Sequence, residues 1–233
     1  MGMSDSLRLD SLVDDLAGDL KPVRRLAPPT FRALGWFAAV LALAVVLSPL
    51  ADLHAMRERL GVPDLCVAAI GAVLTALCAA LAAFQTSVPG RSRLWALLPL
   101  PPLALWIGAS SLGCLRAWIA PDSNIADTAE MRGCLYFLLG VSLPLSVLLV
   151  LMLRRACPTR PNLTAALAGL ATAGAAAALL VPFHPHDATA SDLAMHALAV
   201  AVIIGLNGLA GGRLLDRGTS RTTGGPAPSA PRR

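Results

Sequence analysis

Residues 162–182 read NLTAALAGLATAGAAAALLVP, an uncharged stretch long enough for a helix to cross the hydrocarbon core of a membrane. Nine of these residues are alanine, and Gly169 and Gly174 add two more positions without a bulky side chain. Small residues let helix backbones approach each other closely in lipid. The stretch therefore predicts a membrane helix that packs tightly against its neighbours.

Five further apolar stretches have a similar length. The six predicted spans cover residues 33–50, 64–86, 94–113, 133–153, 162–182 and 193–212. The chain of 233 residues is 56% hydrophobic and 14% charged, whereas charged residues make up about a quarter of a typical soluble protein. The sequence thus predicts an all-α integral membrane protein, a bundle of six transmembrane helices that we expect to bury no ionic groups.

The basic residues predict the orientation of these spans. If the N-terminus is cytoplasmic, 15 of the 19 Lys and Arg residues fall on the cytoplasmic side. The positive-inside rule favours this arrangement, and an even number of spans returns the C-terminus to the cytoplasm. The net charge of +5 then follows from topology, so we infer no direct contact with nucleic acid. Residues 213–233 are rich in Gly, Pro, Ser and Thr, which predicts a disordered cytoplasmic tail.

The segment before the first span, residues 1–32, contains a short amphipathic helical pattern. Its apolar face consists of Leu9, Leu12, Val13, Leu16 and Leu20. Residues 1–20 carry a net charge of −4, whereas helices that lie on anionic lipid are rich in Lys and Arg. The acidic polar face therefore favours a groove on another protein as the binding partner. The alternative is that the helix packs on the cytoplasmic ends of its own bundle.

Cysteine and histidine residues gather on the predicted periplasmic side. The candidate sensing residues are Cys114, Cys134, His184 and His186. Thiolates and imidazoles bind zinc and copper ions, and thiols in an oxidising compartment can form disulfides. A metal ion at the periplasmic face and a Cys114–Cys134 disulfide are both compatible with the sequence. The spacing is specific for neither, and the alternative is loop histidines without a ligand.

Catalysis has little support in the sequence. It contains no GxSxG motif and no glycine-rich phosphate-binding loop, so we expect neither an enzyme nor a bound cofactor. The main competing class is a small six-span transporter or channel, because Pro144 and the prolines near residue 100 can bend their helices. A membrane scaffold protein is a third possibility.

Four short motifs resemble a known family in their order and spacing. They are LVDDL at residues 12–16, DLKPVRRLAPP at 19–29, VPG at 88–90 and RRACP at 154–158. Together with the alanine-rich fifth span they resemble the NrsF family of six-span bacterial inner-membrane proteins, over most of residues 7–217. Members of that family are anti-sigma factors for extracytoplasmic-function sigma factors. The resemblance implies that the N-terminal segment, Val23 included, holds a sigma factor until a stress signal releases it.

The same resemblance implies one cysteine at the head of the fourth span and another after the fifth, linked to sensing of metal or oxidative stress. Cys134 matches the first, but His184-Pro185-His186 stands at the place of the second. Three explanations stay open. The histidines have taken over a ligand role, Cys134 pairs with Cys114, or this protein senses a different signal.

Overall fold

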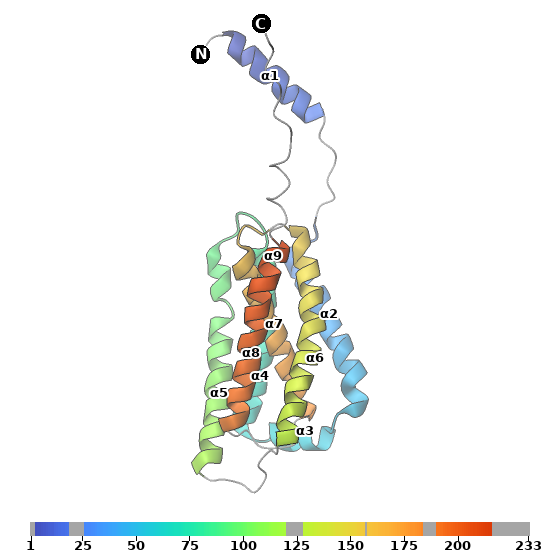
Figure 1. The fold of residues 1–233 in the computed structure, drawn as a ribbon, viewed down its shortest axis with the longest axis vertical. Helices are drawn as coiled ribbons and strands as arrows, with labels where there is room; N and C mark the ends of the chain where they lie inside the picture. The colour runs from blue at the N-terminus through green and yellow to red at the C-terminus, as the bar shows by residue number, and fades with distance from the viewer. Residues whose placement is uncertain (1–2, 19–25, 120–127, 157, 184–189, 216–233) are drawn as a thin grey trace.

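The computed structural model describes residues 3–18, 26–119, 128–156, 158–183 and 190–215, and within this part of the chain every regular element is a helix. Six long helices lie side by side (Figure 1). They are α2 (Pro29–Leu47), α4 (Pro63–Thr86), α5 (Leu100–Ile119), α6 (Thr128–Leu153), α7 (Pro161–Leu180) and α8 (Ala190–Leu206). With the short helices that extend some of them, all six are long and apolar enough to span a membrane. The predicted fold class is confirmed.

Shorter elements complete the described chain. They are α1 (Met3–Gly18), η1 (Ser48–Leu50), α3 (Leu53–Leu60), η2 (Arg93–Leu97), η3 (Arg154–Ala156), η4 (Val181–Phe183), the π-helical turn η5 (Asn207–Gly211) and α9 (Gly212–Leu215). Proline occupies the first helical turn of α2, α4 and α7, where its missing N–H is not needed. The side chain of Asp52 caps α3 by accepting hydrogen bonds from the backbone N–H groups of His54 and Ala55.

Two predicted loop regions are helical. The connection between α5 and α6 is shorter than expected, because α5 continues to Ile119 and α6 begins at Thr128. In the predicted disordered tail, residues 213–215 belong to α9, and Leu215 is buried. The prediction of disorder is wrong for these three residues, since they are helical and the side chain of Leu215 packs into the bundle. The remainder of the tail lies outside the described residues.

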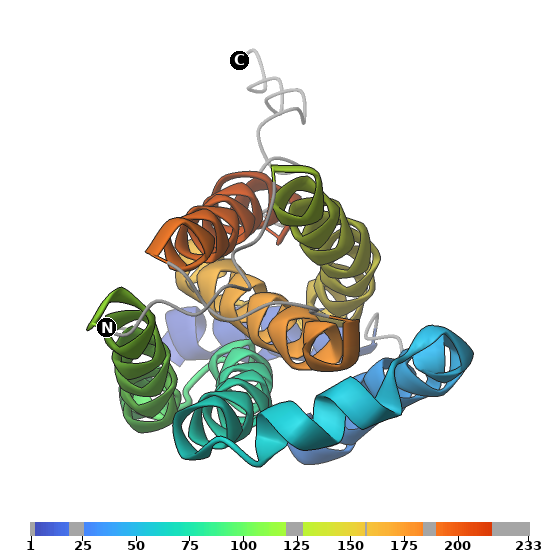
Figure 2. The same cartoon turned by 90° about the horizontal axis from the view of Figure 1, so that it is seen from below.

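The central helix of the bundle is α7, which packs against α4, α6 and α8 (Figure 2). Its span is 61% buried, the largest share of the six. A Cβ atom on Gly169 would lie 2.8 Å from the Cα atom of Ile204, and one on Gly174 would lie 3.1 Å from the carbonyl oxygen of Ala72. The predicted tight packing is therefore confirmed at both glycines. At Gly208 in η5, by contrast, no atom lies within 4 Å of the position of an added Cβ atom.

Hydroxyl and amide groups link three of these elements inside the bundle. The Asn207 side-chain amide donates to the Ser146 Oγ atom across 3.0 Å, and the Ser146 and Thr172 hydroxyls lie 3.0 Å apart. All three residues are buried. Polar groups inside a membrane bundle need such partners, because water is not available to replace them. The cluster joins α6 to α7 and to η5.

The expectation of a bundle without buried ionic groups is wrong. Arg32 and Asp64 are each only 8% exposed. Arg32 lies in the first turn of α2, where its guanidinium finds a backbone carbonyl and an aromatic ring on other helices. Asp64 lies in the first turn of α4, where the positive end of the helix dipole favours a carboxylate. Side-chain contacts thus offset the loss of hydration at Arg32, and the helix dipole offsets part of it at Asp64.

The two ends of the bundle differ in charge. One end, here called the α1 end, carries the start of α2 and α9, with α1 beyond them; the other, called the α3 end, carries α3 (Figure 1). Among the described residues, the arginines at the α1 end are Arg32, Arg91, Arg93, Arg154, Arg155, Arg160 and Arg213. Those described at the α3 end are fewer. The asymmetry that predicted the orientation is thus retained in the folded protein.

Candidate functional site

The most exposed apolar surface outside the bundle lies on α1. Leu12, Val13 and Leu16 are 53%, 60% and 62% exposed, and they occupy one face of this helix. Every described side chain from residue 10 to residue 18 is exposed, and α1 stands apart from the bundle (Figure 1). The alternative that α1 packs on its own bundle is therefore not observed. An amphipathic helix with no packed face is typical of a segment that binds a partner groove.

The other predicted members of this surface are not described at side-chain level. Leu9 lies in α1, but the structure does not define its side chain, and Leu20 and Val23 lie outside the described residues. The exposed aspartates Asp10, Asp14 and Asp15 flank the apolar face. A partner groove that fits α1 therefore needs an apolar floor and basic residues along its rim.

The helix that follows α1 in the chain, α2, is held to the bundle through two polar side chains. Arg32 donates from its Nη2 atom to the carbonyl oxygen of Met152 on α6, and its guanidinium carbon lies 4.8 Å from the centre of the Phe84 ring on α4. Trp36, fully buried, donates its indole N–H to the carbonyl oxygen of Leu145 on α6 across 3.3 Å. We call Arg32 and Trp36 together the α2 anchor.

Sequence reasoning missed the α2 anchor. From the sequence alone, Arg32 is one of the basic residues that predict the orientation, and Trp36 is an apolar residue of the first span. A signal was present, because an arginine directly before an apolar stretch and a tryptophan four residues later lie on the same helix face. The anchor matters because only 11% of the α2 span is buried, so few other contacts hold this helix.

At the α3 end, the structure describes one of the four candidate sensing residues in full. Cys134 lies in the second turn of α6 and is 7% exposed. One turn further along, Phe137 contacts Phe183 of η4, with ring centres 5.1 Å apart. This ring contact joins η4 to the cysteine-bearing end of α6.

The remaining sensing candidates are not brought into a described cluster. Cys114 lies within α5, but its side chain is not defined, and His184 and His186 lie outside the described residues. Among the side chains that the structure defines, no group of three or more His, Cys, Asp or Glu residues could hold a metal ion. The predicted disulfide and the predicted metal ligands therefore stay predictions.

Comparison with known proteins identifies the family. A family model described as "Negative regulator of sigma F" matches residues 16–216 of this chain. The chain belongs to the NrsF family. The curated "Anti-sigma-F factor NrsF" of Caulobacter vibrioides is 32% identical over 219 residues, covering 91% of this chain and all of that protein. No solved structure matches.

Membership of the NrsF family confirms the resemblance predicted from the four short motifs. The family model begins at Leu16, inside α1, and ends at residue 216, directly after α9. It therefore covers all six long helices, the whole segment that links α1 to α2 and the last three residues of α1. The family is one of regulators, and its name gives a sigma factor as the protein that is regulated.

Proposed function

We propose that this NrsF-family protein is an anti-sigma factor of the bacterial inner membrane, with both termini in the cytoplasm. It holds an extracytoplasmic-function sigma factor through residues 1–32. The observation that carries this proposal is the exposed face of Leu12, Val13 and Leu16 on α1, a helix that stands apart from the bundle. A regulator that binds a soluble protein needs such a surface outside the membrane.

The apolar face of α1 contributes part of the free energy of sequestration. Burying one exposed leucine or valine side chain contributes about 1.5–3 kcal/mol. Three such side chains contribute about 4.5–9 kcal/mol before the cost of ordering the segment, so micromolar affinity, about 8 kcal/mol, also requires contacts from other residues of the segment. Asp10, Asp14 and Asp15 add electrostatic selection for a basic rim on the partner.

We expect release of the sigma factor to proceed through α6, because this helix runs from one end of the bundle to the other. This helix carries Cys134 in its second turn and, further along, the backbone carbonyls that accept hydrogen bonds from the α2 anchor. We propose that a metal or oxidative signal at Cys134 shifts α6, loosens Arg32 and Trp36, and frees α2 to move. Because α2 leads directly into the N-terminal segment, the hold on the sigma factor changes.

The substitution Leu16→Asp tests the binding surface. It places a charge in the apolar face of α1 and should weaken sigma-factor binding by roughly tenfold to a hundredfold or more. The measurement is co-purification of the sigma factor with the full-length membrane protein, together with transcription from a sigma-dependent promoter. Ser11→Asp is the matched control, since it adds the same charge on the opposite face of α1. Unchanged binding by Leu16→Asp would exclude this face.

A further inference from the structure

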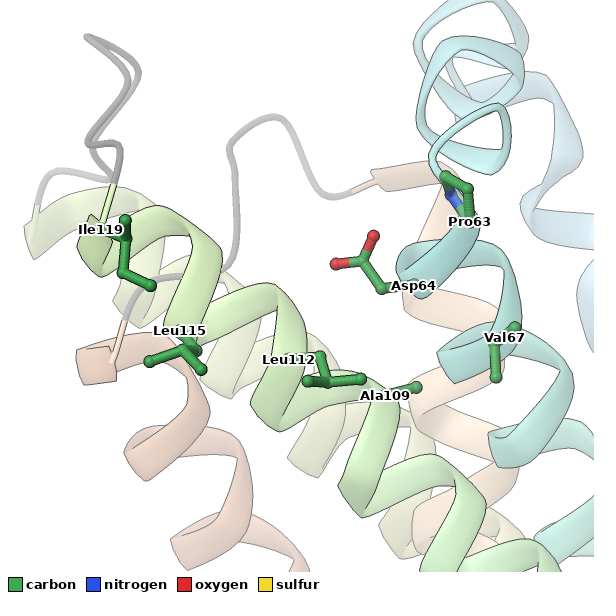
Figure 3. Close-up of a pocket in the computed structure, with 7 residues that line it drawn as sticks. All are labelled: Pro63, Asp64, Val67, Ala109, Leu112, Leu115 and Ile119. Carbon is green, nitrogen blue, oxygen red and sulfur yellow. The ribbon is translucent and has the colours of Figure 1, made fainter.

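A groove of about 480 Å³ lies on η2, the short helix that leads into α5 at the α1 end of the bundle. Its size is typical of small-molecule sites, which enclose about 300–1,000 Å³. The residues that line this η2 groove are Ser92, Leu94, Trp95, Leu97 and Leu98. A second groove, between α4 and α5 at the α3 end, has the acidic Asp64 among its lining residues (Figure 3). The η2 groove instead has basic neighbours, because Arg91 and Arg93 flank Ser92 in the chain.

A tight turn before η2 determines where these two arginines leave the chain. In residues 88–91, the Arg91 N–H donates to the carbonyl oxygen of Val88 across 3.4 Å. A type II turn favours proline at its second position and glycine with positive φ at its third, and here Pro89 is followed by Gly90 with a φ of 81°. Ser92 then caps η2, because its Oγ atom accepts a hydrogen bond from the Leu94 N–H across 3.2 Å.

The polar groups beside the groove are suited to bind a phosphate. Arg91 and Arg93 are exposed, and within the described part of the chain neither guanidinium makes an ion pair. Arginine binds phosphate through two parallel N–H···O bonds, which makes it a preferred partner for this group. The Ser92 hydroxyl adds a donor, since its bond with Leu94 uses the oxygen as an acceptor.

The apolar part of the groove lies where the membrane begins. The third segment that is long and apolar enough to span a membrane starts at Arg93. Leu94 and Leu97, directly after it, are 72% and 54% exposed. Trp95 is half-buried between them, and tryptophan is enriched at the membrane–water interface because its ring is apolar and its N–H is polar. A ligand that fits has an apolar chain in the membrane and an anionic group at its edge.

We propose that the η2 groove binds an anionic phospholipid. Arg91, Ser92 and Arg93 hold its phosphodiester, and one acyl chain lies along the exposed leucines of η2. A zwitterionic phospholipid fits less well, because the cation of its headgroup meets two guanidinium groups. The site lies on η2 and the turn before it, so it does not depend on the proposed sigma-factor binding by α1.

The experiment measures lipid binding by native mass spectrometry of the full-length protein in detergent micelles. Palmitoyl-oleoyl phosphatidylglycerol and phosphatidylcholine with the same chains are added in equal amounts, and their different masses report each bound lipid. Two arginines near a membrane surface favour an anionic lipid by roughly tenfold to thirtyfold, so we expect phosphatidylglycerol to bind more tightly by that factor. Glycerol 1-phosphate, a headgroup without chains, should not displace it.

Two variants test the groove and one controls for charge. Arg91→Gln/Arg93→Gln should bind both lipids equally. Arg155→Gln/Arg213→Gln removes the same number of exposed charges from η3 and α9 at the same end of the bundle, and it should keep the preference for phosphatidylglycerol. Ser92→Asp retains a capping oxygen for η2 but places a negative charge beside the phosphate, so it should abolish the preference.

The outcomes separate a lipid site from the general positive charge of this end. Equal loss of the preference in Arg91→Gln/Arg93→Gln and Arg155→Gln/Arg213→Gln overturns the proposal, as does a preference that survives in Ser92→Asp. Absence of any preference in the unmodified protein rejects it too. Displacement of phosphatidylglycerol by glycerol 1-phosphate assigns the site to a soluble phosphate and rejects the lipid. If the double variant at residues 91 and 93 fails to fold, as judged by size-exclusion chromatography, Ser92→Asp decides.

Discussion

The indole nitrogen of Trp36 on α2 lies 3.3 Å from the carbonyl oxygen of Leu145 on α6, and the hydrogen bond between them is buried. α2 and α5 have the least buried spans of the bundle, each at 11%. The hydrogen bonds of Trp36 and Arg32 therefore form an important part of the attachment of α2 to α6. The same helix also carries Cys134.

Trp36→Phe should weaken the attachment of α2 to α6 without creating a large cavity at residue 36. The aromatic ring is retained, but the N–H donor is lost, and a buried hydrogen bond contributes about 0.5–1.5 kcal/mol. We expect a lower thermal midpoint in detergent and, through the proposed mechanism, raised sigma-dependent transcription without any inducer. Trp95→Phe, at a half-buried position in η2, is the control. Equal transcription from both variants would argue against the α2 anchor as a regulatory contact.

Arg32→Lys should weaken the other half of the α2 anchor although the charge is kept. Lysine lacks the planar guanidinium that both donates to Met152 and lies over the Phe84 ring. A cation–π contact of this kind contributes about 0.5–2 kcal/mol, so the variant should unfold at a lower temperature in a thermal-shift assay. The exposed Arg93→Lys serves for comparison and should leave the midpoint unchanged.

Gly71→Ala should destabilise the contact between α4 and α5. The added methyl group would lie 2.8 Å from backbone atoms of Trp106, which cannot rotate away, and overpacking of this kind costs about 1–3 kcal/mol. Gly108→Ala on α5 meets open space and should be neutral or stabilising. Thermal unfolding of the two variants in the same detergent gives the comparison, and a midpoint for Gly71→Ala at or above that of Gly108→Ala would refute the contact.

Cys134→Ser should reduce induction by metal or oxidant while leaving repression intact. Serine keeps the size of the side chain but has neither a metal-binding thiolate nor a thiol that can be oxidised. Reporter transcription during exposure to zinc, cadmium and hydrogen peroxide measures the effect. Cys66→Ser, half-buried near the same end, is the matched control. Full induction of Cys134→Ser by each of these agents would remove this residue from the sensing step.

The six spans were predictable because each is a continuous apolar run of membrane-crossing length, and the structure places a long helix on every one. The tight approach at Gly169 and Gly174 was also predictable, since small residues in an apolar helix have few other uses. Local composition determines both features. No knowledge of the neighbouring helix was required.

The polar contacts inside the bundle could not be predicted in the same way. Arg32 finds Met152, 120 residues further along the chain, and Trp36 finds Leu145 at a separation of 109 residues. Such pairs depend on which helices become neighbours, and the sequence pattern does not encode that choice locally. Asp64 was overlooked for a related reason, because its burial follows from the approach of Gly113 on α5.

The position of α7 has a consequence for biosynthesis. It is the fifth span to leave the ribosome, yet it is the helix around which α4, α6 and α8 assemble. Chains enter the membrane N-terminus first, so α2, α4 and α5 are inserted before their central scaffold has been translated. Maturation of the bundle therefore waits for the ribosome to pass residue 180, and a transcript cut short before that point yields inserted helices that lack the helix at the centre of the bundle.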